Sequence, residues 1–251
     1  MSGAGLSAPT GELLYTYTDP VRGRLLKRYK RFFADVELES GEVVTAHCPN
    51  TGPMSGVCEL GAPVLLSHNP SPKRKLAYTW EAIELVGSAG RPVWVGVNTN
   101  LPNRVVKELL NRRLIPELGG YDTVRSEVKY GADSRVDFLL EGTESGKPIY
   151  VEVKNTTWTD GTLAKFPDTV TERGQKHLRE MTAVMPDAAA VMLYFINRED
   201  CDRFAPGDDR DPTYGQLLRQ AIAQGMGVLP CRFAVSPIGL HFLGLATCDF
   251  V

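Results

Sequence analysis

The sequence predicts a two-domain protein of the α+β or α/β class, in which a small β-barrel precedes a mixed α/β domain. The 251 residues are enough for one large domain or two small ones, and the apolar and charged contents are those of an ordinary globular chain. The pattern of elements also changes near residue 98. We therefore expect a loose tail over residues 1–12, a barrel over 13–97 and the α/β domain over 98–251.

The barrel is predicted from short apolar runs that turn residues separate. No long helical pattern occurs before residue 98, and Gly, Pro, Ser and Asn interrupt the chain repeatedly. The expected strands lie in FFADVEL, EVVTAHC, PVLLSHN, LAYTWEAIEL and PVWVGVN. Short strands in succession, with no helix between them, are typical of a small barrel.

Helices alternate with strands in the second part of the chain. The stretch TNLPNRVVKELLNRRLIPEL places Pro102 early in a helix and spaces apolar residues along one helical face. Further helices are expected in DTVTERGQKHLREMTAVMP and DPTYGQLLRQAIAQGMG, and the apolar run AAAVMLYFIN between them predicts a buried strand. Strands in VLPCRFAVSP and GLHFLG complete the pattern of a mixed α/β domain.

One hairpin of this domain has polar residues inside apolar strands. SRVDFLLEGTESGKPIYVEVKNTT predicts a strand, a turn and a strand. Asp137 interrupts the first strand, and Glu152 and Lys154 share one face of the second because side chains alternate along a strand. Carboxylates that hold a divalent cation, with a positive group beside them, can hydrolyse a phosphodiester, and the Val153 carbonyl could add a ligand. The alternative is a solvent-facing strand edge with a Glu–Lys ion pair.

The hairpin resembles the PD-(D/E)xK nuclease motif, and segments along the whole chain resemble one protein family. From about residue 20 to 245 the sequence is similar to the SfsA family, the sugar fermentation stimulation proteins. The segments that carry this resemblance are HCPNTGPM, KRK, TWE, VNTNLPNR, SEVKYG, RVDF, VEVKN and FPDTVTERGQKHLRE. The resemblance implies an OB-like barrel joined to a nuclease-like α/β domain. It also implies DNA binding without strong sequence preference and a link to sugar metabolism.

The resemblance to the nuclease motif implies roles for individual residues. Asp137 and Glu152 would hold Mg²⁺ or Mn²⁺, and Lys154 would polarise water or stabilise charge. Glu127 could complete the metal site, or it could be a surface residue in an ion pair. Gln175 could orient substrate or water from its helix, or it could belong to a solvated helix face.

Two basic clusters in the barrel predict contact with nucleic acid. The segments VRGRLLKRYKRFF and SPKRKLAYTW concentrate Lys and Arg among aromatic residues, although the formal net charge is only −2. Basic groups can follow phosphates while aromatic rings stack on bases, but some of these rings could instead be core residues. The residues expected to contact nucleic acid are Arg28, Tyr29, Lys30, Arg31, Lys73, Arg74 and Lys75.

The loop HCPNTGPM is expected to be structural, with possible nucleic-acid contacts through Asn50 and Thr51. Its His47 and Cys48 would point to opposite faces of a strand and are poorly placed as a catalytic pair. The remaining histidines have no metal-ligand spacing and are expected to be structural: His68, His177 and His241.

Patterns that are missing from the sequence narrow the expected compartment and the class of protein. The five cysteines have no zinc-ligand spacing, the N-terminal segment has no signal-peptide pattern, and no apolar run reaches about 18 residues. A reducing cytoplasm is the expected compartment. We expect a magnesium-dependent phosphodiesterase that binds DNA; the sequence does not separate DNA from RNA and says nothing of oligomeric state. The alternative is a non-enzymatic DNA-binding regulator of sugar (maltose) metabolism.

Overall fold

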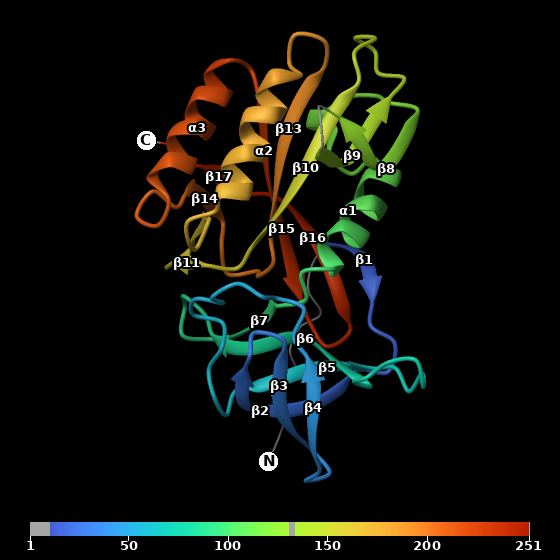
Figure 1. Ribbon diagram of the computed structural model, residues 1–251, viewed down its shortest axis with the longest axis vertical. Helices are drawn as coiled ribbons and strands as arrows, with labels where there is room; N and C mark the ends of the chain where they lie inside the picture. The colour runs from blue at the N-terminus through green and yellow to red at the C-terminus, as the bar shows by residue number, and fades with distance from the viewer. Residues whose placement is uncertain (1–10, 131–133, 251) are drawn as a thin grey trace.

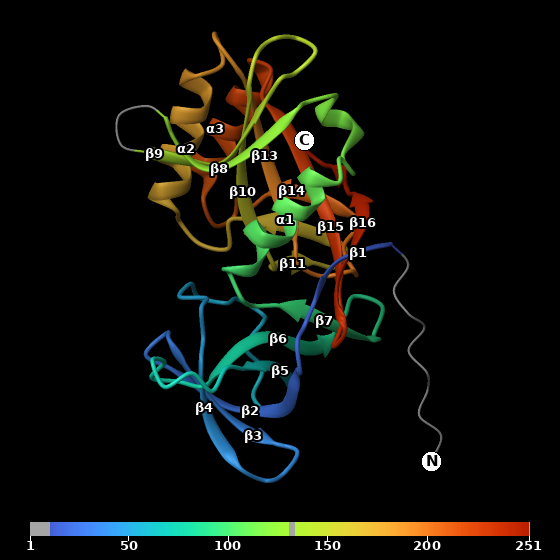
Figure 2. The same ribbon diagram turned by 90° about the vertical axis from the view of Figure 1, so that its right-hand side faces the viewer.

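The computed structural model describes residues 11–130 and 134–250, which form two domains stacked along the long axis of the molecule (Figures 1 and 2). A β-barrel forms the lower part in Figure 1, and an α/β domain forms the upper part. Most of the tail expected over residues 1–12 lies outside the described residues. No helix within the described ranges is long and apolar enough to cross a membrane.

The barrel has five strands, whose order is β4-β3-β2-β5-β6, and a parallel pairing of β4 with the start of β6 closes it. Alternate side chains of these strands point inward, and Leu25, Val36 and Trp80 are fully buried in one core. The strands are β2 (Val21–Tyr29), β3 (Phe33–Leu38), β4 (Val43–His47), β5 (Pro63–His68) and β6 (Tyr78–Val86).

The α/β domain is built on a mixed sheet with helices on both faces. α1 (Leu101–Asn111) covers one face, and α2 (Glu172–Ala183) and α3 (Pro212–Ala223) cover the other (Figure 1). In the centre β10, β13 and β15 run parallel, while the outer strands pair antiparallel. The strands are β8 (Thr123–Tyr130), β9 (Ser134–Glu141), β10 (Ile149–Thr156), β13 (Ala189–Ile196), β15 (Gly227–Val235) and β16 (Gly239–Leu245).

Shorter elements complete this domain. A 3₁₀ helix, η1 (Pro116–Leu118), follows α1. A small second sheet lies beside α3 and is formed, in spatial order, by β11 (Thr159–Asp160), β12 (Leu163–Phe166), β14 (Arg203–Pro206) and β17 (Thr247–Cys248).

The first strand does not belong to the barrel, contrary to the expected boundary at residue 13. β1 (Glu12–Thr16) pairs antiparallel with β16 of the α/β sheet, and Leu14 is buried in the core beneath α1 (Figure 2). The barrel therefore begins at β2. Alternation of apolar residues predicts that a strand exists, but it does not predict which sheet the strand joins.

The two domains share a continuous interface. β7 (Pro92–Gly96) pairs along β6 and also contacts β15 through the pair Trp94–Val235, so one 13-stranded sheet runs through both domains. Leu65, Ala82 and Trp94 lie in the same apolar core as α1 rather than in the core of the barrel. Part of the outer surface of the barrel is thus buried against the α/β domain.

A buried ion pair between Arg198 and Asp200 links the α/β domain to the turn between β6 and β7. Arg198, only 5% exposed, donates to both carboxylate oxygens of Asp200, at 2.6 and 2.8 Å, and to the carbonyl oxygen of Thr157 at 3.2 Å. Asp200 also accepts a hydrogen bond from the backbone N–H of Ser88, in the turn between β6 and β7, at 3.1 Å. The turn between β6 and β7 is therefore fixed to the segment that follows β13.

We expect Asp200→Ala to lower the free energy of unfolding by about 3 kcal/mol, because the buried Arg198 guanidinium loses its charge partner. Urea titration followed by tryptophan fluorescence measures this loss. The control is Glu141→Ala, which removes an exposed ion pair with Arg125 and should cost less than about 1 kcal/mol. Equal losses in the two variants would contradict the role of Asp200 at the interface.

Candidate functional site

Glu152 and Lys154 form a buried ion pair on β10. The Lys154 Nζ donates to Glu152 Oε1 at 2.7 Å, and the two side chains are 12% and 4% exposed. The alternating residues Val151 and Val153 point to the other face of the sheet, into the core beneath α1. The pair is therefore directed toward α2, and it is not the solvent-facing pair that the sequence left open.

Asp137 meets this pair where β9 and β10 separate. Backbone pairing of the two strands ends at Phe138 and Val151. Beyond this point the Val153 N–H donates to Asp137 Oδ2 at 2.7 Å, so a side-chain carboxylate replaces a backbone acceptor. Asn103 of α1 donates to Asp137 Oδ1, also at 2.7 Å. The structure thus brings the three residues of the hairpin motif together, and it adds Asn103.

His177 of α2 also belongs to this cluster, although the sequence analysis treated it as a structural residue. Its Nδ1 contacts Glu152 Oε1, and Arg173 Nε donates to its Nε2 at 3.4 Å. A tautomer protonated at Nδ1 satisfies both contacts. His177 shares the buried face of α2 with Gly174, Leu178 and Met181. Their helical spacing in the sequence could have indicated that the His177 side chain points toward the sheet.

The two carboxyl groups of the site have opposite electrostatic environments. Burial alone would raise the pKa of Glu152, but the hydrogen bond from His177 and the charge of Lys154 outweigh burial and lower it. Burial and the nearby Glu152 carboxylate raise the pKa of Asp137 to about 6, and hydrogen bonds from Val153 and Asn103 offset only part of this rise. The charge of Lys154 lowers the pKa of Asp137 as well, but it does not outweigh burial and the Glu152 carboxylate.

The oxygen atoms of the site fit a divalent cation only in part. Within residues 11–130 and 134–250, no group of three or more His, Cys, Asp and Glu side chains lies close enough together to hold a metal ion. However, Glu152 Oε2 is buried and has no hydrogen-bond partner in the described chain, and Asp137 lies beside it. Two carboxylates suit a hard cation such as Mg²⁺, which keeps several water ligands.

Glu127, the candidate for a third acidic ligand, lies on β8 across from Asp137 in the strand register. Its side chain is exposed, and no contact with Asp137 or Glu152 is recorded among the described residues. Its backbone has a φ of 54°, which non-glycine residues rarely adopt within a strand. Such strain is often retained at functional sites. A role for Glu127 in the metal site stays a prediction.

Gln175 does not reach the Glu152 cluster. Its Nε2 donates to both carboxylate oxygens of Asp211, at 3.0 and 3.1 Å, and Asp211 caps the N-terminus of α3. Gln175 precedes His177 by two residues, so the two side chains leave α2 in nearly opposite directions. The structure therefore assigns Gln175 to the contact between α2 and α3, contrary to the expectation that it assists chemistry.

The basic clusters of the barrel divide into structural and exposed residues. Arg28 donates to the carbonyl oxygens of Asn50 and Gly52, at 3.0 and 2.9 Å, and so anchors this loop instead of extending toward a ligand. Tyr29 stacks on Phe33 with centroids 5.4 Å apart, and Tyr29 also bonds Asp35. Five of the residues expected to contact nucleic acid are exposed, namely Lys30, Arg31, Lys73, Arg74 and Lys75, although Arg74 also donates to Thr79 Oγ1.

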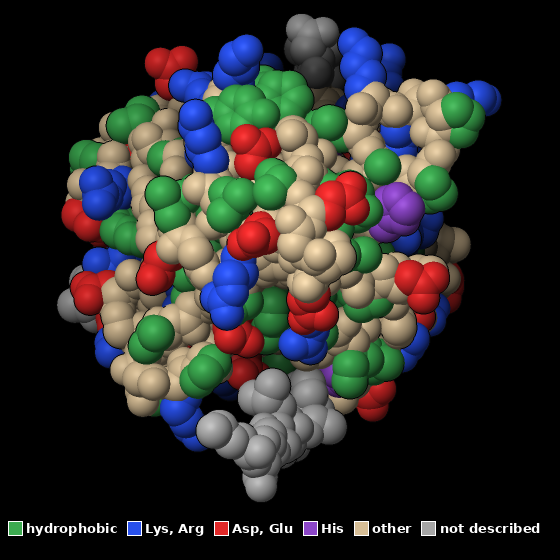
Figure 3. Space-filling view, turned by 90° about the horizontal axis from the view of Figure 1, so that it is seen from below, with side chains coloured by type: hydrophobic (Ala, Val, Ile, Leu, Met, Phe, Trp, Pro, Cys, Tyr) green, Lys and Arg blue, Asp and Glu red, His purple; other side chains and the backbone are tan. Residues whose placement is uncertain are grey.

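The exposed cations do not form one uninterrupted patch on the end of the barrel. Figure 3, which views the molecule from this end, shows Lys and Arg side chains interspersed with acidic ones. Any nucleic acid would therefore contact separate basic groups rather than a uniform positive surface.

Family models match both parts of the chain. Residues 26–104 match the SfsA N-terminal OB domain, and residues 100–239 match the sugar fermentation stimulation protein RE domain. A sugar fermentation stimulation protein homolog of Synechococcus elongatus is 65% identical over 93% of this chain and 97% of its own. A homolog of the same description from Picosynechococcus is 64% identical over 96% of each chain.

A solved structure with the same fold is that of Pyrococcus furiosus SfsA in complex with Ca²⁺. It has a TM-score of 0.83, is 23% identical in sequence, and covers 94% of this chain and 99% of its own. The family resemblance and the predicted fold class, an OB barrel followed by a mixed α/β domain, are confirmed.

In the presence of EDTA, we expect Asp137→Asn to be more stable than the wild type at pH 7.5, by on the order of 2–3 kcal/mol. The folded protein raises the pKa of Asp137 from 3.8 to about 6, so ionisation costs stability. This cost is absent below pH 4, grows as the pH rises from 4 to 6, and is constant above. In the variant the new amide oxygen can still accept the hydrogen bond from the Val153 N–H. The new amide NH₂ can donate to Asn103 once the Asn103 amide has turned its oxygen toward it.

Urea unfolding at pH 4.5, 5.5 and 7.5 measures this difference. Asp187→Asn, which changes an exposed aspartate at the opposite end of the sheet, serves as the control and should show no such pH dependence. An Asp137→Asn protein that is no more stable than the wild type at pH 7.5 would show that the charge of Asp137 is not costly.

Proposed function

This chain belongs to the family of sugar fermentation stimulation proteins, and from the geometry of its Glu152 site we propose that it binds nucleic acid and hydrolyses phosphodiester bonds with the help of a divalent cation. DNA is the proposed substrate, and RNA is a second arm of the test below. The barrel would hold the nucleic acid through its exposed cations, and the α/β domain would act on the phosphate.

The observation that supports this proposal is that the buried Glu152 and the partly buried Asp137 lie beside each other where β9 and β10 separate. Burying a carboxylate is costly unless charge compensates it, and the compensation of Asp137 is incomplete, because its pKa stays raised. A protein that only binds phosphates gains nothing from two buried anions, which would repel the ligand. A site for a divalent cation gives both carboxylates a function.

The residues of the site suit distinct roles in such a reaction. Asp137 and Glu152 would hold the cation, which lowers the pKa of bound water and stabilises charge on a phosphate. Lys154, beside Glu152 at 2.7 Å, can stabilise the charge that develops as the bond breaks. His177 positions Glu152 by contacting its Oε1. The P. furiosus relative was solved with Ca²⁺, a cation that also takes oxygen ligands.

The first turn of α1 adds positive potential next to Asp137. Asn100 makes no side-chain cap, no acidic residue lies in the first turn, and Asn103 of this turn already donates to Asp137. Backbone N–H groups at a helix N-terminus favour an anion. This location supports placing the scissile phosphate between α1 and the end of β10.

The second candidate is a DNA-binding regulator without catalytic activity. It is favoured by one observation, namely that Lys154 and His177 already compensate Glu152 without a metal ion. Both candidates share the exposed basic residues of the barrel. They differ in whether Lys154 is needed for turnover or only for affinity.

We expect the wild type to cleave labelled DNA with Mg²⁺ or Mn²⁺ but not with EDTA, and Lys154→Ala to cleave at least about 100-fold more slowly. DNA affinity should hardly change, because the charge that Lys154 would stabilise develops only in the transition state. Glu152→Gln should lose metal-dependent turnover as well. Gel assays on single- and double-stranded DNA and RNA, with calorimetric titration of the metal, measure these effects.

Lys176→Ala is the matched control, because Lys176 is an exposed lysine of α2 and should leave cleavage unchanged. Cleavage that persists equally in Lys154→Ala and Glu152→Gln would identify a contaminating nuclease and remove these residues from the site. No cleavage of any substrate by the wild type would favour the regulator.

We expect replacement of Lys30, Arg31, Lys73 and Lys75 by Gln to weaken DNA binding to a similar degree for all sequences. Each lost phosphate contact should also reduce the slope of log affinity against log salt by about 1. Fluorescence anisotropy at several salt concentrations measures both effects. Lys147→Gln, at the far tip of the β9–β10 hairpin, should leave the slope unchanged. A slope that is equal in the fourfold variant and the wild type would place the nucleic acid elsewhere.

A further inference from the structure

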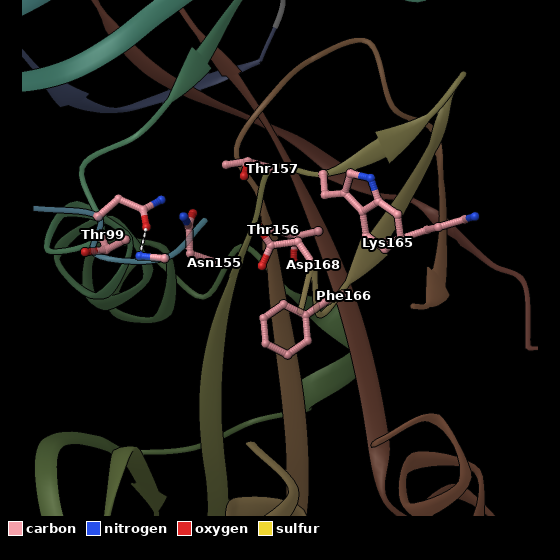
Figure 4. Close-up of a pocket in the computed structure, with 10 residues that line it drawn as sticks. Thr99, Asn155, Thr156, Thr157, Lys165, Phe166 and Asp168 are labelled. Carbon is pink, nitrogen blue, oxygen red and sulfur yellow. Dashed lines mark hydrogen bonds between the residues drawn. The ribbon is translucent and has the colours of Figure 1, made fainter. Parts of the chain in front are cut away.

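A pocket lies between the barrel and the α/β domain, just beyond Lys154 at the end of β10 (Figure 4). Figure 4 shows Thr99 and Asn155 on one side of the pocket and Lys165 on the other, with Thr156, Thr157, Asp168 and Phe166 between them. The loop at Asn50 and Gly52, which Arg28 anchors, supplies the wall from the barrel. Both domains are therefore needed to form it.

We propose that this pocket receives one unpaired nucleobase, next to the phosphate bound at the Glu152 site, so that the protein acts on single strands, frayed ends or extruded nucleotides. The inference rests on the function proposed above and specifies its substrate class.

The position of the pocket fits a base attached to a phosphate at the site. Lys154 and Thr156 are two residues apart on one strand, which is roughly 7 Å. A nucleotide whose phosphate lies near Lys154 therefore has its base within reach of the pocket. The N-terminus of α1 lies between the pocket and the Glu152 site, because Thr99 lines the pocket and Asn103 contacts Asp137.

Phe166 provides a fixed aromatic surface in the pocket. Its ring packs against Tyr194 and Tyr214, with centroids 5.7 and 5.3 Å apart and interplanar angles of 54° and 70°. The two tyrosines are fully buried, and their hydroxyl groups are hydrogen-bonded to each other at 2.7 Å. Because this packing holds the Phe166 ring in place, a base can stack on the ring without first ordering it.

The polar groups that line the pocket suit the edge of a base. The Asn155 Oδ1 accepts from Asn197, which leaves the Asn155 amide N–H groups as donors for base oxygens or ring nitrogens. Asp168 contributes a carboxylate, an acceptor that matches the amino groups of cytosine, adenine and guanine. A cavity with an aromatic wall and a few convergent polar groups is typical of a small-ligand site.

The pocket suits one base rather than a base pair. Its empty volume is about 420 Å³, part of which is open to solvent. A base in a duplex has its polar edge occupied by its partner, so it must leave that partner to present the edge to Asn155 and Asp168. Unpairing costs least for single strands and frayed ends, so these should bind best.

The test measures binding in EDTA, where no cleavage can occur, with a single-stranded DNA oligonucleotide containing 2-aminopurine at one end. We expect its fluorescence to be quenched when the wild type binds, and a blunt duplex of the same sequence to bind at least about tenfold more weakly. Asp168→Asn and Phe166→Leu should each weaken single-strand binding about tenfold and reduce the quenching. Asp187→Asn, at the opposite end of the sheet, is the matched control for Asp168→Asn and should bind like the wild type.

Thermal unfolding of each variant shows whether Phe166→Leu is still folded, and the isosteric Asp168→Asn gives an answer that does not depend on core packing. Equal affinity for single strand and duplex, with both pocket variants unaffected, would overturn the proposal even if Glu152-dependent cleavage were found. Loss of quenching in both variants would support the pocket even if no substrate were cleaved, in which case only the catalytic function would fail.

Discussion

The burial of Glu152 on a central strand is the constraint on which the site depends. A glutamate side chain that is 4% exposed must be compensated, and the compensation comes from two directions: Lys154 on the same strand and His177 on α2. His177 reaches Glu152 only if α2 lies across the sheet in one orientation, and the contact of Gln175 with Asp211 fixes that helix to α3. The contact of Gln175 with Asp211 thus helps to determine which groups surround Glu152.

The second carboxyl group is left without a comparable partner, and this asymmetry gives the site its chemical character. Asp137 receives hydrogen bonds from neutral groups only, from Asn103 and Val153, while the anionic Glu152 lies nearby. The folded protein therefore contains an unfavourable interaction between these two carboxyl groups. Natural proteins accept such a cost where a ligand relieves it, since function and stability often compete at a site.

The parts of the structure that depend on local periodicity could be predicted from the sequence, and the parts that depend on packing could not. Strand alternation was enough to predict that Glu152 and Lys154 share a face. It could not predict which face of α2 meets Glu152, so His177 was treated as structural, while Gln175 was the residue of this helix expected to orient substrate or water. For the same reason Arg28, one basic residue among many in the sequence, was not distinguished as the anchor of the loop at Asn50.

The 13-stranded sheet that crosses the domain boundary has a consequence for how such a chain can be divided. A barrel expressed alone would expose Leu65, Ala82 and Trp94 to water, and a separate α/β half would lose the side chains that cover part of its core. Neither half is a self-sufficient module. The distance between the barrel surface and the Glu152 site is consequently fixed by one shared sheet and one shared core.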